Sequence, residues 1–360
     1  MSCNQELLSG TETSKRDQLK KEKPRVYEKI LKFDEKVKKG ESIAIVQFKY
    51  NYKCNFKCEH CSIKRFQGKK EGERFDLDKV RDLARQADEM GLAQFVITGG
   101  EPLVFSDLED LIMAIDPSKF YIISDSNGWH LDHEKAKRLK EIGLDKIQLS
   151  LDSLDAKEHD DFRRAPGSHA RAMNAIDACL DAGLNIILST VVTKQRVRSD
   201  EFIEYLEFAK SKGVGTFVTY AKPVGSWEGN FDVLVDKDDM KYTEELEKKY
   251  NVFTHLTPSY GLDLGCIAVK RMISVTQYGD VLPCPYIHTS IGNVFEEPLK
   301  DIVERGLNIK FFGKHVDTCM IAEDRDFINK YATKMYNRPL PVPYKEVFED
   351  DDDYIDINKK

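Results

Sequence analysis

Three cysteines, Cys54, Cys58 and Cys61, follow one another at C-x3-C-x2-C spacing. A loop this short can direct three thiols toward one point, and sulfur ligands select zinc, copper(I) or iron–sulfur clusters. A structural zinc site takes four protein ligands, yet no fourth cysteine lies nearby, and His60 is poorly placed to share a metal with the adjacent Cys61. The spacing favours a [4Fe–4S] cluster with one iron open to a non-protein ligand. Three buried thiols, or a zinc site completed by a distant residue, are the alternatives.

A second motif begins 38 residues after Cys61, where Gly99-Gly100-Glu101-Pro102 directly follows the apolar run 93–98. The two motifs in this order resemble the radical S-adenosylmethionine (SAM) superfamily, in which a GGE-type loop follows the cysteine loop. The resemblance implies that the open iron binds SAM and that its reductive cleavage yields a 5′-deoxyadenosyl radical, which abstracts hydrogen from a substrate. Such chemistry belongs to the cofactor, and the protein positions it.

The resemblance also implies which residues bind SAM: Gly99, Gly100, Glu101, Pro102, Ser126, Asn127, Ser150, Asp152 and Arg163. The two glycines would let the backbone approach the methionyl group, and Glu101 would accept a hydrogen bond from its ammonium group. Asp152 would accept from the ribose hydroxyls, while Arg163, or alternatively Arg164, would pair with the SAM carboxylate. His60 would pack near adenine, and no residue is assigned as a general base.

Three further cysteines lie in the last third of the chain. Cys266 and Cys284 fit C-x12-G-x4-C, which is followed by Ile291-Gly292-Asn293 and resembles the SPASM/Twitch extension of the superfamily. Because Cys319 is the one additional cysteine here, the pattern favours the Twitch form, with one auxiliary iron–sulfur cluster of the [4Fe–4S] type. Its fourth ligand stays open between water, substrate, His315 and Asp317.

Unligated thiols buried in a hairpin domain are the alternative for this region. The sequence Pro283-Cys284-Pro285 speaks against it, because two prolines are unusual in an ordinary central strand. Of the two remaining cysteines, Cys3 is expected in a disordered start and Cys179 in the core on the buried face of a helix.

Strand and helix patterns alternate through the middle of the chain, which predicts parallel βαβ units. Predicted strands cover 42–50, 94–98, 120–125, 146–151, 184–192 and 214–220, and predicted helices cover 76–90, 105–115, 132–142, 170–182 and 199–212. Six units fit a partial (β/α)6 TIM-like barrel, although a doubly wound open sheet would show the same alternation. The polar motifs fall at strand ends, where parallel barrels carry their active sites.

The predicted α/β organisation has five parts: a basic extension (1–40), the radical SAM partial barrel (41–225), a bridging helix (226–254), a Twitch-type domain of a β-hairpin plus helix (255–335) and an acidic tail (336–360). Residues 15–39 carry eleven Lys and Arg against five acids, and residues 346–360 carry seven acids against two lysines. Both charged segments are interpreted as solvated or flexible.

Composition excludes several classes of protein. The net charge of −7 argues against a general nucleic-acid binder, and no apolar run is long enough for a membrane span or a secretory signal. Eight cysteines without an export signal predict a reducing cytoplasm, where clustered thiols bind metal.

The predicted function is net oxidation of a small polar molecule, such as a sugar, cyclitol or amino compound, supplied with electrons by flavodoxin or ferredoxin. Rim residues that could touch this substrate are Asp125, Tyr220, Lys222, Trp227 and Glu228. The alternatives are a radical SAM epimerase, a peptide-modifying enzyme and, more remotely, a non-catalytic zinc module.

Overall fold

Six parallel strands form the centre of the structure, a computed structural model that describes residues 10–68 and 71–357. These strands are β1 (Ile45–Asn51), β2 (Gln94–Gly99), β3 (Tyr121–Ser126), β4 (Lys146–Ser150), β5 (Asn185–Val192) and β6 (Gly215–Tyr220). They pair in chain order, each parallel to the next, as predicted. β-Branched and aromatic residues, as in the Asn185–Val192 sequence NIILSTVV, suit such buried strands.

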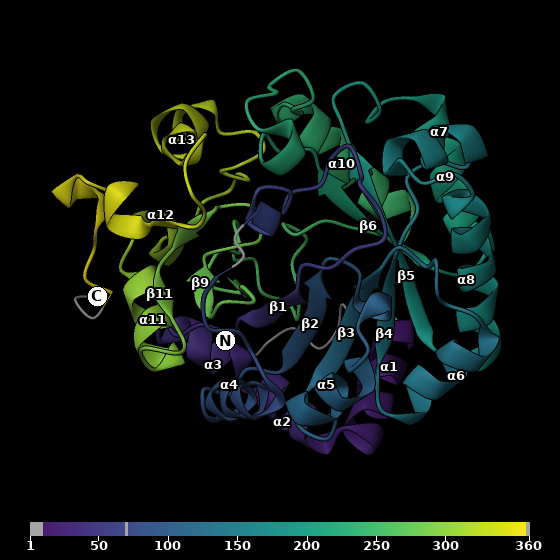
Figure 1. Cartoon of the computed structure of the whole chain (residues 1–360), viewed down its shortest axis with the longest axis horizontal. Helices are drawn as coiled ribbons and strands as arrows, with labels where there is room; N and C mark the ends of the chain where they lie inside the picture. The colour runs from purple at the N-terminus through teal and green to yellow at the C-terminus, as the bar shows by residue number, and fades with distance from the viewer. Residues whose placement is uncertain (1–9, 69–70, 358–360) are drawn as a thin grey trace.

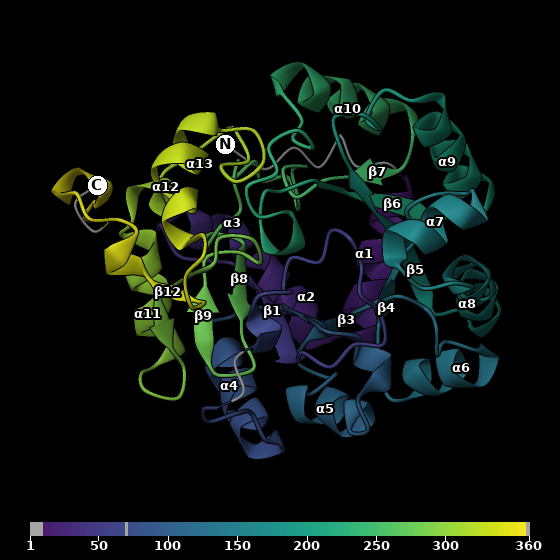
Figure 2. The ribbon, with the colours of Figure 1, turned by 45° about the horizontal axis from the view of Figure 1, so that its top comes forward.

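Helices cover the outside of this curved sheet (Figures 1 and 2). They are α4 (Leu77–Glu89), α5 (Leu108–Ile115), α6 (His133–Glu141), α7 (Ala156–Arg163), α8 (Ser168–Ala182) and α9 (Asp200–Ser211), followed by α10 (Lys237–Lys249). α4 shows why these segments are helical: Asp76 caps its first turn by accepting from the Lys79 amide, and its apolar residues recur on one buried face. The alternation predicted from sequence is therefore confirmed as an α/β fold with a parallel central sheet.

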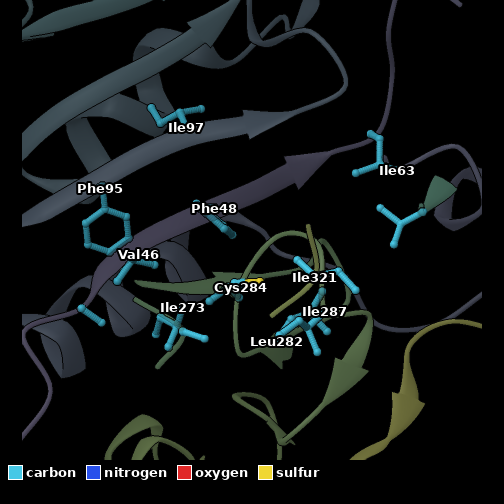
Figure 3. Close-up of a cluster of buried hydrophobic side chains, with 14 of the residues drawn as sticks. Val46, Phe48, Ile63, Phe95, Ile97, Ile273, Leu282, Cys284, Ile287 and Ile321 are labelled. Carbon is cyan, nitrogen blue, oxygen red and sulfur yellow. The ribbon is translucent and has the colours of Figure 1, made fainter. Parts of the chain in front are cut away.

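Three strands of the C-terminal region extend the barrel sheet. β8 (Met272–Val275) pairs in parallel with β1, β9 (Asp280–Leu282) pairs antiparallel with β8, and β11 (Gly292–Asn293) pairs with β9. At the other edge, the short β7 (Val252–Phe253) joins β6. Figure 3 shows the result: side chains from β1 and β2 share one apolar cluster with Ile273, Leu282 and Cys284.

The remaining C-terminal elements pack beside this hairpin. They are α11 (Leu299–Leu307), α12 (Lys310–Gly313), α13 (Arg325–Lys330) and the two-stranded pair β10 (Thr289–Ser290) and β12 (Val342–Pro343). The acidic tail lies against them, because Tyr331 donates to the buried Asp353 carboxylate and Lys330 pairs with Asp350. It is thus held by α12 and α13, and the interpretation of a flexible acidic tail is wrong for the residues described.

The basic N-terminal segment is helical, and its part from Pro24 on is packed, which corrects the interpretation of a solvated arm there, whereas most side chains of residues 16–22 are exposed. It forms α1 (Gly10–Glu22), α2 (Pro24–Leu31) and α3 (Phe33–Lys38). Lys29 is buried, pairs with Asp88 and lies 3.9 Å from the Phe120 ring centroid. Cys3 lies outside the described residues. Among residues 10–68 and 71–357 there is no helix with the length and apolar character needed to cross a bilayer.

Candidate active site

One cavity of about 280 Å³ opens at the carboxyl ends of the parallel strands and holds most of the predicted site. Alternate residues along the strands face it, because side chains one residue apart point to opposite sides of a sheet. Its strand-borne lining includes Gln47, Lys49, Gln148, Ser150, Ser189, Val191, Phe217 and Thr219. The cavity is therefore the interior of the barrel, closed from the side by the C-terminal segment.

Both groups of predicted cysteines line this cavity: Cys54, Cys58, Cys61, Cys266, Cys284 and Cys319. All six are free thiols. The first three are half-buried on the loop after β1, and the last three are buried in the C-terminal region. The fold thus brings together two motifs that are separated by more than two hundred residues in the sequence.

Gly99 and Gly100 pack against the backbone that leads into the cysteine loop. Gly99 has φ +126°, and a Cβ on Gly100 would lie 1.9 Å from the Lys53 carbonyl oxygen. The Gly100 amide donates to the Asn51 carbonyl oxygen at 2.8 Å, and the Glu101 amide donates to the Lys53 carbonyl oxygen at 2.9 Å. The glycines therefore permit the close approach that positions Cys54. Contact with the SAM methionyl group stays a prediction.

Replacing Gly100 with alanine is expected to destabilise the protein by about 3 kcal/mol, because backbone on both sides must shift to admit the methyl group. Urea unfolding measures this change. Gly68→Ala is the matched control, since nothing lies within 4 Å of its added Cβ, and it should change the free energy of unfolding by less than about 0.5 kcal/mol. Equal effects of the two substitutions would contradict the packing role of Gly100.

Glu101 is a buried carboxylate that joins three loops. It accepts hydrogen bonds from the Ser126 hydroxyl at 2.8 Å and from the Asn127 amide at 2.7 Å. The Asn127 side chain in turn donates to Asn55 in the cysteine loop at 2.8 Å. Burial raises the pKa of Glu101 to about 7, against the opposing effect of these hydrogen bonds. The structure thus brings Glu101, Ser126 and Asn127 together beside the first cysteines. Pro102 follows in the first turn of a short 3₁₀ helix.

Asp152 and Arg163, both predicted to contact SAM, pair with each other. The Arg163 Nε lies 2.6 Å from an Asp152 carboxylate oxygen, and its Nη1 lies 3.9 Å from the Cys58 sulfur. Burial alone would raise the pKa of Asp152, but the Arg163 charge together with smaller effects, among them a hydrogen bond from the Val191 amide, lowers the pKa to about 2. Arg163 is buried and lines the cavity, whereas Arg164 is exposed, so the geometry favours Arg163 over Arg164 as a ligand-binding residue.

His60 lies in an aromatic group at the cavity wall. Its ring stacks on Phe162 with centroids 4.5 Å apart and lies 5.9 Å from the Trp227 ring. Its Nδ1 is buried without a hydrogen-bond partner, and burial lowers its pKa to about 3. The imidazole is therefore neutral, which suits packing against a flat aromatic ligand.

The residues suggested as a fourth ligand are wrongly placed for that role. His315 and Asp317 form an exposed ion pair at 2.8 Å and are not among the residues that line the cavity. His255, which the sequence analysis missed, does line it, and its Nε2 is buried without a partner. Of the predicted rim residues, Glu228 is also outside the cavity lining, because it pairs with Arg65.

Two lysines in the cavity wall are buried, and the sequence analysis missed one of them. Lys49 on β1 is 2% exposed, and Lys222 after β6 is 6% exposed. Burial lowers the pKa of Lys49 to about 7 and also lowers the pKa of Lys222. The alternation of polar Gln47 and Lys49 with apolar Val46 and Phe48 in β1 was the available signal for Lys49.

Asp125 on β3 lines the cavity with Oδ1 buried and without a hydrogen-bond partner. Burial raises its pKa to about 7, although Thr98 donates a hydrogen bond that opposes the shift. Since this folded pKa exceeds the unfolded value of about 3.9, its contribution to stability is complete below pH 4. That contribution disappears as pH rises through 7.

Asp125→Asn is therefore expected to flatten the pH dependence of stability. From pH 5 to pH 8, the free energy of unfolding of the wild type should fall by about 2 kcal/mol more than that of the variant. Urea unfolding at the two pH values measures the difference. Parallel pH profiles for the two proteins would contradict a protonated, buried Asp125.

Comparison with known proteins gives two family matches that coincide with the two cysteine groups. Residues 49–216 match the radical SAM superfamily, and residues 266–321 match an iron–sulfur cluster-binding domain of the SPASM type. The chain belongs to the radical SAM superfamily. Radical SAM and SPASM domains together imply a [4Fe–4S] cluster, SAM and auxiliary iron–sulfur clusters as cofactors.

Relatives of this radical SAM protein carry different names. The AdoMet-dependent heme synthase of Nitratidesulfovibrio vulgaris is 24% identical over 298 residues, covering 74% of this chain and 80% of the relative. The GTP 3′,8-cyclase of Campylobacter curvus is 28% identical over 295 residues, covering 75% and 86%. Streptococcus suis SuiB bound to S-adenosylmethionine is 20% identical with a TM-score of 0.59, covering 75% of this chain and 68% of that one, which supports the fold alone.

The residues lining the cavity fit these cofactors. In the described part of the chain, no three His, Cys, Asp or Glu side chains gather as they would around a single metal ion. The thiols within each group act electrostatically on one another, as near neighbours do, and a cubane cluster can take each of three cysteines on a separate iron. Cys54, Cys58 and Cys61 would hold the SAM-binding cluster, and Cys266, Cys284 and Cys319 would hold an auxiliary one.

Proposed function

We propose that this radical SAM enzyme abstracts hydrogen from a small polar molecule and oxidises it overall by two electrons, with the auxiliary centre accepting one of them. The observation that carries this proposal is the single cavity shared by both cysteine groups. A substrate inside it has one group of thiols on the loop after β1 and the other in the C-terminal region. When bound, the SAM cluster supplies the radical that removes hydrogen.

The chain's own residues bind and orient the substrate. Gln47, Gln148, Ser189 and Thr219 offer hydrogen bonds along the strands, which suits a small polar molecule. The Glu101 network fixes the cysteine loop against the end of β3. An external one-electron donor such as flavodoxin or ferredoxin would reduce the enzyme.

The cysteine inventory supports oxidation over epimerisation. An epimerase needs a cysteine that donates hydrogen to the product radical. Among the described residues, Cys179 is the one cysteine outside the cavity lining, and it is fully buried in α8. With the other six thiols assigned to clusters, none of the described cysteines is left to donate hydrogen at the cavity.

The test is anaerobic turnover with SAM and reductant against a panel of sugars, cyclitols and amino compounds. A substrate should accelerate 5′-deoxyadenosine release and return as a product lighter by two hydrogens. Substrate deuterium should appear in 5′-deoxyadenosine. A product of unchanged mass that carries solvent hydrogen would replace this proposal with epimerisation, and turnover of a peptide alone would replace it with peptide modification.

A further inference from the structure

Two buried lysine side chains contact one short segment of the cavity wall, residues 284–286. The Lys49 Nζ is 3.5 Å from the Pro285 carbonyl oxygen. The Lys222 Nζ is 4.2 Å from the centroid of the Tyr286 ring and donates to the Tyr220 carbonyl oxygen at 2.6 Å. One lysine comes from the first barrel strand and the other from the loop after the sixth, so the fold, not the local sequence, brings them to Cys284.

Neither lysine has a carboxylate partner among the described residues. The polar atoms near them are carbonyl oxygens, and the acidic groups that act on their charges are cysteine thiols: Cys284 for Lys49, and Cys266, Cys284 and Cys319 for Lys222. A buried cation without a counter-ion costs several kcal/mol. The third buried lysine among the described residues, Lys29, is paired with Asp88. The described residues therefore supply no carboxylate to balance the charge of these two lysines.

A cluster bound to the three cysteines would supply only part of that negative charge. An oxidised cubane held by three thiolates carries a net charge of about −1, while Lys222 and Lys49, whose pKa burial lowers to about 7, together carry between one and two positive charges at neutral pH. Positive charge in excess of the charge on the cluster therefore lies beside residues 284–286. Asp125, the strand-borne carboxyl of the lining, belongs to β3, and because burial raises its pKa to about 7 it carries at most part of a negative charge at neutral pH.

We infer that Lys49 and Lys222 form a binding subsite for an oxyanion, a carboxylate or phosphate group of the substrate, next to Cys284. Primary ammonium groups bind such anions through charge-assisted hydrogen bonds. The inference deepens the proposed function, since it narrows the substrate from a small polar molecule to a small molecule with an anionic group. It also predicts orientation: the anionic end lies toward the C-terminal cysteines, and the carbon that loses hydrogen lies toward the loop after β1.

The test measures anion binding to the anaerobically reconstituted full-length protein without SAM or turnover. Acetate stands for a carboxylate and sulfate for a phosphate group, and each is titrated calorimetrically at constant ionic strength. We expect saturable binding of at least one of them, weakened about tenfold or more by Lys49→Met and by Lys222→Met. Lys29→Met, which removes an equally buried lysine outside the cavity, should leave the affinity unchanged.

Two further measurements are needed: anion binding by Lys222→Arg and the iron content of each variant. The arginine keeps the charge and should keep anion binding, which separates loss of charge from misfolding of the methionine variant. Unchanged affinity for both anions in Lys49→Met and Lys222→Met would overturn the inference, as would failure of the wild type to bind either anion. Loss of iron with anion affinity retained would likewise overturn it, because the lysines would then serve the cysteine-bound centre. None of these measurements depends on radical chemistry, so failure of the proposed function would be seen separately.

Discussion

Replacing Cys54, Cys58 and Cys61 together with alanine will abolish release of 5′-deoxyadenosine from SAM. The three thiols lie on one loop at the cavity, and the cluster that they are proposed to hold is the source of the electron that cleaves SAM. Iron in the reconstituted protein should fall by about four atoms per chain. Chromatographic detection of 5′-deoxyadenosine and chemical iron analysis measure the two effects.

The fold should survive this substitution, because all three thiols are half-buried and none forms a disulfide. Cys179→Ala is the matched control: it removes a thiol that is fully buried in α8 and remote from the cavity lining. The Cys179→Ala substitution should lower the free energy of unfolding and leave both iron content and SAM cleavage unchanged. Continued release of 5′-deoxyadenosine by the triple variant would remove the proposed mechanism.

The barrel was predictable because its signals are local. Apolar strands, amphipathic helices and helix-ending glycines each occupy a short window, so the predicted strand 214–220 and the observed Gly215–Tyr220 nearly coincide. α7 lacks this local signal and was missed, because its buried face carries His159 and Arg163 in place of apolar residues. The parallel pairing of Ile45 with Met272 could not be read from periodicity, because it joins residues far apart in the chain.

The candidate site likewise contains residues that local motifs predict and residues that only the fold brings together. The cysteines and Glu101 stand in motifs with fixed spacing, and the structure gathers them at one cavity. Partners across the fold carry no such spacing, so the pairing of Asp152 with Arg163 and the position of Lys49 beside residues 284–286 emerged only from the structure. A tertiary contact can also remove a candidate: the pairing of Glu228 with Arg65 takes that carboxylate away from the cavity.

Replacing Cys266, Cys284 and Cys319 with alanine should separate the two halves of the reaction. These thiols are buried, and burial raises the pKa of Cys284 to about 11 and of Cys319 to about 12. They are therefore neutral in the metal-free protein and become ligands only as metal displaces their protons. We expect iron to fall from about eight to about four per chain. Cleavage of SAM should continue, while the oxidised product disappears.

The two triple variants should lose different steps of the reaction. The loop that holds Cys54, Cys58 and Cys61 is fixed by Glu101, Asn127 and the Gly99–Gly100 contact, none of which involves the C-terminal cysteines. Loss of the second group should thus leave the first intact, and substrate deuterium should still reach 5′-deoxyadenosine. If the C-terminal variant kept its oxidised product, the auxiliary centre would have no part in removing the second electron. Its cysteines would then have a purely structural function between β8 and the cavity.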